Sequence, residues 1–356
     1  MLHVSGVPTS FFRKRRRHGS VSGVLGAASL LLIVSAASVQ PDRTGSVGAL
    51  AARAREALLA RPSLNAFGVS QQVRVRFALP GAAVEFPLEV VGEPAALDYA
   101  WVSVDASEPA DSAADSSDAM RRMVDSDFVA PTQPGFYHLV VQRGKDRVVV
   151  PEPVLAVMVP FAEKHGVRLN GYRIGTYLAE RFAGHRDHPD GFLQVNETDL
   201  GLHVTTHLTL ADFITHDQQV SVWPKYVALN PRLLDKLELV LSKVGANAQL
   251  ASPGDDSAEV AFDVHSGFRT PAHNRYVPRS ARDSRHQYGE AADVAIDANG
   301  DGRVTRTDQV LVARAVDEVE AEHPDLVGGL GMYVSRRYRT PYVHIDVRGT
   351  RIRWTG

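Results

Sequence analysis

One short stretch, residues 284–293, constrains this chain most, because it places two metal-binding side chains seven residues apart. The two are His286 and Asp293, and histidine and aspartate are both common ligands of Zn²⁺. Three of the six residues between them are small and leave room for a tight turn followed by a closely packed strand: Gly289, Ala291 and Ala292.

The C-terminal run at residues 342–347 offers a third ligand, His344. We therefore expect a zinc site made of His286, Asp293 and His344, with the fourth position left to water, as in catalytic zinc sites. The chain contains no cysteine, so a zinc site here depends on histidine and carboxylate ligands. Disulfides and cysteine nucleophiles are excluded for the same reason.

Length and charge set wider limits on the function. The 356 residues provide room for two folded domains and a targeting segment, and the hydrophobic content of 44% is ordinary for a globular protein. A net charge of −2 gives no general attraction to nucleic acid, so we expect no nucleic-acid partner.

Residues 1–45 have the composition of an export signal. A basic run at residues 13–17 precedes an almost uncharged apolar run at residues 21–39. This order predicts either a secretory signal peptide or an uncleaved membrane anchor, and the sequence leaves that choice open. In both cases the rest of the chain is exported to the periplasm or cell envelope, and only the N-terminal segment contacts the membrane.

The next part of the chain predicts a helix and then strands. Residues 46–67 are alanine-rich and predict a helical spacer. Residues 68–158 carry alternating patterns without a helical period, which predict an immunoglobulin-like β-sandwich with a surface loop at residues 105–119. Gly144 and Lys145 predict a hairpin inside it. The strands are expected near residues 73–79, 84–91, 99–104, 136–142 and 147–150.

Residues 159–200 are rich in glycine, tyrosine and charge, and they predict a connector. Residues 201–356 mix helices and short strands without regular βαβ alternation, so we expect an α+β domain with a small antiparallel sheet. Asn230 and Pro231 predict the start of a helix that ends at Gly245. The other expected elements are a helix at residues 307–322 and strands at residues 260–264 and 342–347.

Three motifs together carry a family resemblance. The pattern Ser-x-His-x-x-Gly-x-Ala-x-Asp is met from Ser284 to Asp293, and residues 266–271 read Ser-Gly-Phe-Arg-Thr-Pro. Residues 343–349 read Val-His-Ile-Asp-Val-Arg-Gly. The second half of the chain therefore resembles the zinc D-alanyl-D-alanine carboxypeptidase-like metallopeptidases, whose fold is shared by the amino-terminal signalling domain of hedgehog proteins.

This resemblance implies a role for each matched residue. The zinc ligands would be His286, Asp293 and His344. Arg269 would face the substrate as a catalytic and binding residue, and Ser284 would support that arginine or the metal. The implied reaction is zinc-dependent hydrolysis of peptide bonds in the stems or cross-links of peptidoglycan, by a carboxypeptidase or an endopeptidase.

One position departs from the family pattern. Several branches place an acid three residues before the last ligand histidine as the general base, and this chain has Pro341 there. Asp346 lies two residues after His344 on the same strand face, so it is either the catalytic base or a carboxylate that orients the histidine. Glu320 and His323 form a Glu-x-x-His pair, but the acids beside them favour a solvated helix end.

A second metal loop is expected at residues 297–308, which fit the template Asp-x-Asn-x-Asp-Gly-x-Val-x-x-x-Asp of EF-hand-like calcium loops. The aspartate at its last position, in place of glutamate, predicts weak binding. Because the loop closely follows Asp293, we expect a structural Ca²⁺, and an acidic turn without an ion is the alternative. The expected ligands are the side chains of Asp297, Asn299, Asp301 and Asp308 and the carbonyl of Arg303.

Three functions remain open at this point. The first is an exported zinc peptidase that acts on peptidoglycan. The second is a non-catalytic peptidoglycan-binding module on the same fold, which Pro341 favours. The third is a calcium-dependent adhesion or scaffolding protein, for which no stoichiometric zinc is expected.

Overall fold

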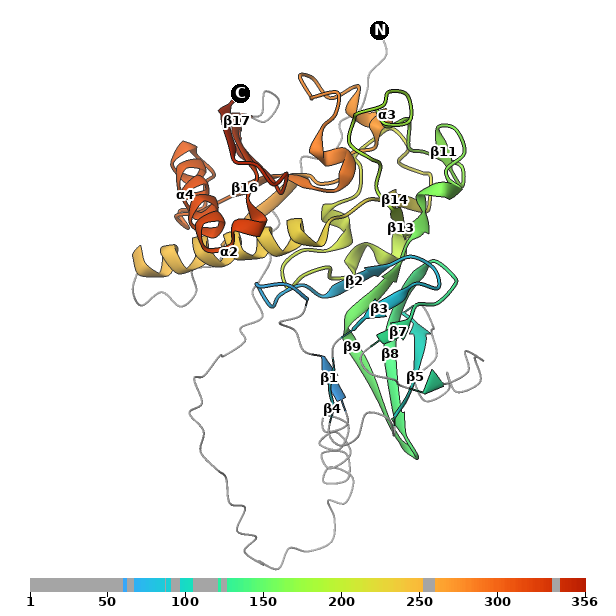
Figure 1. Cartoon of the computed structure of the whole chain (residues 1–356). Helices are drawn as coiled ribbons and strands as arrows, with labels where there is room; N and C mark the ends of the chain where they lie inside the picture. Colours follow the sequence, from blue (N-terminus) through green and yellow to red (C-terminus); the bar gives the residue numbers. More distant parts are fainter. Residues whose placement is uncertain are drawn as a thin grey trace, which may run out of the picture.

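The computed structural model describes residues 60–62, 67–86, 88–90, 97–104, 121–122, 127–251, 260–334 and 340–356. These residues form a mixture of helices and small sheets, which is compatible with the expected α+β class (Figure 1). The expected export segment and the loop at residues 105–119 lie outside the described residues, as does most of the expected spacer helix. None of the described helices is long and apolar enough to cross a membrane.

The end of the expected spacer is a strand instead of a helix. Ala60–Pro62 form β1, which pairs antiparallel with β4 (Leu88–Val90). Pro62 disfavours the helical conformation at the residue before it, and the partner strand satisfies the extended backbone. The single strand expected at residues 84–91 is likewise two strands, because β3 (Ala83–Glu85) pairs with β7 (Asp127–Val129) instead of β1.

A five-stranded sheet dominates residues 75–157. Its order is β2 (Val75–Ala78), β9 (Asp146–Val157), β8 (Gly135–Arg143), β5 (Asp98–Ser103) and β6 (Arg121–Arg122). The hairpin predicted at Gly144 and Lys145 is confirmed, because Arg143 pairs with Asp146 across it. Edge-to-face aromatic contacts fill the space between this sheet and β3 and β7, and they join Phe86, Tyr99, Trp101 and Phe128.

The segment expected to be a connector belongs to the packed interior. It contributes β10 (Val159–Pro160) and β13 (Gly191–Val195), which form a three-stranded sheet with β14 (Lys225–Val227). It also contributes the small hairpin of β11 (Arg168–Leu169) and β12 (Tyr172–Arg173). The segment is packed because its aromatic side chains are buried: Tyr172, Tyr177 and Phe192 are at most 1% exposed.

A second five-stranded sheet carries the C-terminal half. Its order is β15 (Phe262–Ser266), β16 (Ala291–Ile296), β18 (Pro341–Asp346), β17 (Gly329–Val334) and β19 (Ile352–Thr355). The first four strands pair antiparallel, as expected. The unexpected β19 pairs parallel with β17 at the edge.

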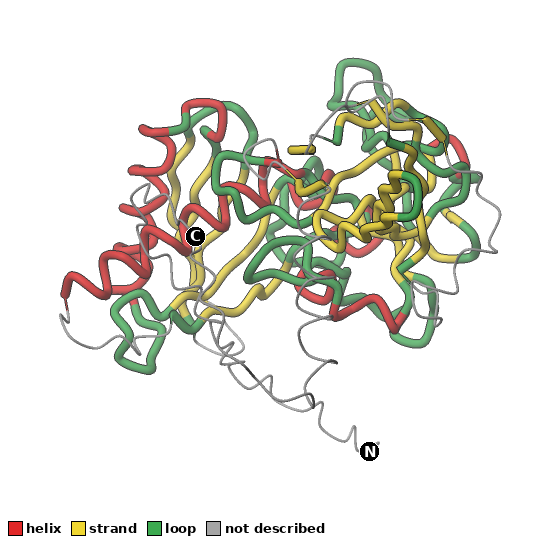
Figure 2. The backbone as a smooth tube through the Cα atoms, turned by 90° about the horizontal axis from the view of Figure 1, so that it is seen from below, coloured by secondary structure: helices red, strands yellow, loops and turns green. Residues whose placement is uncertain are grey.

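Two long helices lie beside this sheet: the later one in the sequence packs on its strands, and the earlier one packs against the later helix (Figures 1 and 2). α4 (Arg306–Glu322) begins within one residue of the expected start, because Thr305 and Asp308 form a capping box there. α2 (Pro231–Ala251) begins where expected but does not end at Gly245. The alanines and other helix-forming residues beyond Gly245 continue the helix, at a cost of about 1 kcal/mol for one internal glycine.

Candidate metal centre

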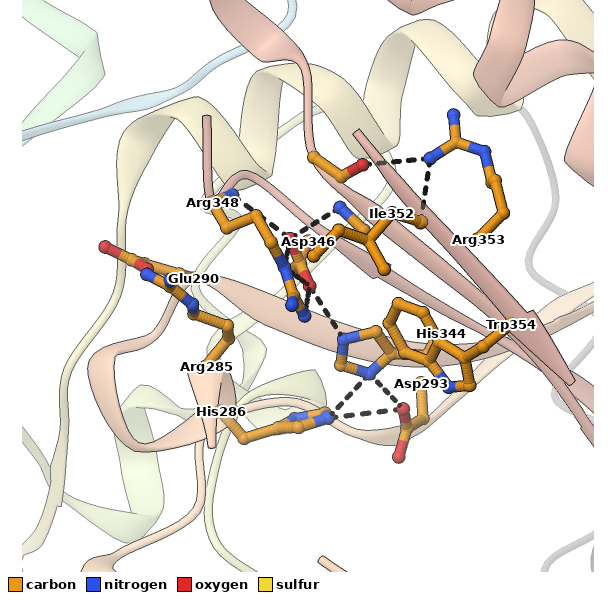
Figure 3. A network of polar contacts seen from close by, with 12 residues as sticks. Arg285, His286, Glu290, Asp293, His344, Asp346, Arg348, Ile352, Arg353 and Trp354 are labelled. Carbon is orange, nitrogen blue, oxygen red and sulfur yellow. Dashed lines mark hydrogen bonds and ion pairs between the residues drawn. The ribbon is translucent and has the colours of Figure 1, made fainter. Parts of the chain in front are cut away.

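His286, Asp293 and His344 meet at one buried point (Figure 3). Asp293 on β16 and His344 on β18 are direct partners across the sheet, and His286 comes from the 3₁₀ helix η7 (Arg285–Tyr288). Asp293 Oδ1 lies 2.9 Å from His344 Nδ1 and 3.2 Å from His286 Nε2. The two ring nitrogens are 3.1 Å apart, so three ligand atoms face a common centre.

The chain has little freedom to fold differently around His286. η7 ends at Gly289, whose φ of 66° lies in the left-handed region that favours glycine. A side chain at Gly289 would also collide with the backbone carbonyl of Ala228. Ala291 and Ala292 are fully buried in the strand that follows, so the turn and the strand hold Asp293 directly beside His286.

The outward nitrogens of both histidines are bound to the protein. His286 Nδ1 donates to the carbonyl of Gly267 at 2.7 Å, and His344 Nε2 donates to Asp346 Oδ2 at 3.1 Å. In these tautomers the inward nitrogens, Nε2 of His286 and Nδ1 of His344, keep their lone pairs for the common centre. Histidines that ligate metals in proteins are almost always held in this way.

The second carboxylate oxygen of Asp293, Oδ2, is also bound to the protein. It accepts a hydrogen bond from Arg269 Nη2, and Arg269 Nε donates to Ser266 Oγ at 2.7 Å. The side chain that supports Arg269 is therefore Ser266, while Ser284 precedes η7 and starts the turn that carries His286. Within the described residues Arg269 Nη1 has no hydrogen-bond partner, and the arginine side chain is 11% exposed.

Asp346 is fully buried and has several partners besides His344. It accepts hydrogen bonds from the backbone N–H of Gly329 at 2.7 Å and from Arg348 Nε at 2.9 Å. It lies on the side of the His344 ring that faces away from the metal-binding centre (Figure 3). This position suits a carboxylate that orients His344 better than one that takes a proton from water.

The charges of the centre are strongly coupled. Burial alone would raise the pKa of Asp293, but His286 and Arg269 outweigh it and hold the pKa well below its usual range. Burial lowers the pKa of His286. Burial also opposes the charge on His344, but hydrogen bonds with Asp293 and Asp346 raise its pKa overall.

These three residues fit a divalent metal ion. They offer two imidazole nitrogens and one carboxylate oxygen within 4.8 Å of one another, all buried. Elsewhere in the described chain, no other group of three such side chains gathers its ligand atoms this closely. The three predicted ligands thus lie together.

Aromatic residues that the sequence patterns did not single out flank the centre. The Trp354 ring lies 5.3 Å from that of His344, and its Nε1 donates to the Tyr333 hydroxyl at 2.5 Å. Tyr333 stacks on Tyr342 with ring centres 5.2 Å apart. Trp354 reaches His344 because Gly331, between them in the sheet, has no side chain, and a Cβ there would collide with the indole.

One other polar residue differs from expectation. Glu320 is buried instead of solvated, and its carboxylate accepts from Lys236 at 2.8 Å, from Arg353 at 2.6 Å and from the Gly328 N–H at 3.0 Å. This burial follows from α2 and α4 packing together, which the local sequence of one helix does not reveal. His265 is half-buried, and its Nε2 lies 3.3 Å from Asp263 Oδ2.

The carboxylates in the loop at residues 297–308 accept hydrogen bonds from the backbone of the same loop. Asp297 accepts from the Gly302 N–H at 2.7 Å, and Asp308 accepts from the Ala298 N–H at 2.9 Å. Asp301 accepts from the Arg303 N–H at 2.9 Å, and Asn299 accepts from the Asp301 N–H at 3.1 Å. Bonds of this kind brace the loop whether or not an ion is bound.

No protein-family model matches this chain, and no significant similarity to a curated protein or a solved structure was found.

Proposed function

We propose that this protein is an exported zinc peptidase that hydrolyses peptide bonds in peptidoglycan. The observation that supports it best is the pair of histidines whose outward nitrogens are fixed by Gly267 and Asp346 while their inward nitrogens face Asp293. Two nitrogens and one oxygen are the ligand set of many catalytic zinc sites. The substrate class comes from the motif resemblance.

Bound zinc would lower the pKa of a water molecule and polarise a carbonyl group as a Lewis acid. The protein contributes orientation and charge. Arg269 holds Asp293 through Nη2 and keeps Nη1 for a substrate carbonyl or carboxylate, which an arginine can bind without losing its proton. Asp346 fixes the tautomer of His344.

Asp346 is poorly placed to act as the catalytic base, because its carboxylate is buried among His344, Arg348 and Gly329. Asp263 and His265 form a half-buried pair, and the His265 ring lies 5.6 Å from that of Tyr342. These two residues are the first to examine for proton transfer.

Digestion of purified muropeptides tests the function. We expect zinc-dependent release of D-alanine or cleavage of a cross-link, and the product tells a carboxypeptidase from an endopeptidase. The variant His286→Ala should have no activity, and chelated wild-type protein should regain activity when zinc is restored. Zinc-loaded protein that cleaves no stem and no cross-link would contradict the proposal.

A second candidate function is a non-catalytic peptidoglycan-binding module. Pro341, in place of the family's general base, favours it. This candidate predicts that the protein binds zinc and muropeptides but cleaves none of them. The same digestion, combined with a binding measurement, separates the two functions.

For the fold, we propose that residues 201–356 form a hedgehog/D,D-peptidase-like domain and residues 68–158 an immunoglobulin-like sandwich. The C-terminal sheet supports the first, because it brings the three motifs of the resemblance to one place. The sheet around β8 and β9 supports the second. Export through residues 1–45 is part of the same proposal, and a fusion of that segment to a reporter enzyme would test it.

We further propose a structural Ca²⁺ in the loop at residues 297–308, bound by Asp297, Asn299, Asp301, Asp308 and the carbonyl of Arg303. The sequence template supports it, and the loop joins β16, which carries Asp293, to α4. Adding EGTA to zinc-loaded protein should lower its thermal stability. An unchanged melting temperature and activity would contradict this role.

A further inference from the structure

Positive charge is concentrated in two segments outside the metal centre, residues 163–186 and 271–285. Together they contain nine lysines and arginines but only three aspartates and glutamates, while the whole chain has a net charge of −2. An excess of six positive charges in two short segments creates a local field that the overall composition conceals.

The two segments are neighbours in the structure. α3 (Pro271–Asn274) packs against the strand pair β11 and β12, since the Ala272 N–H donates to the Ile174 carbonyl at 2.9 Å (Figure 1). Further along both segments, His185 Nδ1 lies 3.9 Å from Asp283 Oδ2. The positive charges therefore belong to one region of the surface.

Six arginines of this region are exposed, and we name them the arginine surface: Arg168, Arg173, Arg181, Arg275, Arg279 and Arg282. Within the described residues none of the six has an ion pair. Arginines elsewhere do have acidic partners, as Arg74 has Glu152 and Arg353 has Asp317. The arginine surface thus keeps its charge available to an external partner.

Two large apolar side chains protrude from the same segments. Phe182 is 53% exposed and Tyr276 is 73% exposed. Each is next in sequence to a member of the arginine surface, Arg181 and Arg275. Several guanidinium groups with exposed rings among them suit a long, flexible anionic partner better than a single small ion, because each contact is weak and several contacts act together.

Short stretches of chain connect the arginine surface to the metal centre. Arg282 is four residues before the ligand His286, and α3 begins two residues after Arg269. A polymer bound to the arginine surface would therefore be held by segments that also carry residues of the centre. Guanidinium groups bind carboxylates in a two-pronged manner, and the peptides of peptidoglycan carry free carboxylates along the polymer.

We propose that the arginine surface binds the stem-peptide carboxylates of intact peptidoglycan and holds the polymer beside the metal centre. This proposal rests on the proposed function for the identity of the polymer. It adds a second contact, away from the scissile bond, that makes the intact wall a better ligand than a short fragment.

Sedimentation with insoluble sacculi tests the proposal, with chelated full-length protein so that binding is measured without cleavage. We expect binding that weakens as salt is added and that is lost when the carboxylates of the sacculi are converted to amides. The double variant Arg275→Glu/Arg279→Glu should bind on the order of tenfold more weakly. The matched control is Lys145→Glu/Arg314→Glu, which makes the same charge change elsewhere and should bind like wild type.

Equal binding by the two double variants, or equal binding to native and amidated sacculi, would overturn the proposal. Binding to anionic lipid vesicles without binding to sacculi would also overturn it and assign the surface to a membrane. Circular dichroism shows whether each variant is folded. Muropeptide cleavage by zinc-loaded wild-type protein is measured separately, so a failure of the proposed function and a failure of the arginine surface give different results.

Discussion

His344 Nε2 donates to Asp346 Oδ2 at 3.1 Å, on the side of the ring opposite to Asp293 and His286. This bond decides which nitrogen of His344 faces the metal-binding centre. Replacing Asp346 by asparagine would leave the shape nearly unchanged but remove the charged acceptor. We expect Asp346→Asn to bind zinc about 10- to 100-fold more weakly, the usual effect of losing such a partner.

Competition with a chromophoric chelator measures that affinity. The exposed Asp325→Asn is the control and should bind zinc like wild type. If Asp346 were the catalytic base instead, Asp346→Asn would keep its zinc affinity and lose only activity.

The metal centre should bind one zinc ion per chain. Removing a ligand leaves two, so His286→Ala should lose stoichiometric zinc, while the exposed His165→Ala should retain it. Zinc at about a hundredfold excess over its dissociation constant should stabilise wild-type protein by about 2.7 kcal/mol. Elemental analysis and thermal unfolding measure the two effects, and equal zinc content in both variants would place the metal elsewhere.

Because Gly331 has no side chain, the Trp354 indole fits beside His344. A methyl group at this position would displace the indole, so Gly331→Ala should reduce the free energy of unfolding by about 1–3 kcal/mol, as overpacking does. Gly201→Ala is the matched control, since a Cβ there meets no other atom. Denaturant titration measures stability, and unchanged tryptophan fluorescence in Gly331→Ala would show that the indole had not moved.

Glu320 and Lys236 form a buried ion pair between the two long helices. Glu320→Gln would leave the fully buried lysine without its carboxylate, at a cost of about 3–5 kcal/mol. The double variant Glu320→Gln/Lys236→Met removes both charges and should recover part of that loss. Glu318→Gln, on an exposed ion pair, should cost less than about 1 kcal/mol.

The loss in Glu320→Gln should depend on pH. Burial lowers the pKa of Lys236, so the folded variant releases the lysine proton at a lower pH than the unfolded chain does. The unfolded state then binds more protons than the folded state, and stability rises with pH. The free energy of unfolding of Glu320→Gln should therefore increase between neutral and alkaline pH, relative to that of wild type.

Local sequence patterns predicted more of the metal centre than of the residues that pack around it. His286 and Asp293 are joined by one turn, and His344 lies in a strand with clear alternation, so short stretches were sufficient to find them. The contact of Trp354 with His344 depends on β19 pairing parallel with β17 across Gly331. No local pattern encodes which strand an edge strand will join.

The errors have related causes. The expected connector is packed because its aromatic residues have partners far away in the sequence. Glu320 is buried because α2 lies against α4, and α2 passes Gly245 because one glycine costs less than the helix gains. Each outcome depends on tertiary contacts that outweigh the conformational preference of the local sequence.

Asp235 on α2 accepts hydrogen bonds from the backbone N–H groups of Val69 and Ser70, at 2.9 and 2.8 Å. Beside them Gly68 leaves no room for a Cβ against the same carboxylate. Residues 68–70, which precede the first five-stranded sheet, therefore contact α2 in the C-terminal half. A protein truncated at residue 201 would therefore lack these partners, and the buried carboxylate of Asp235 would be exposed to solvent.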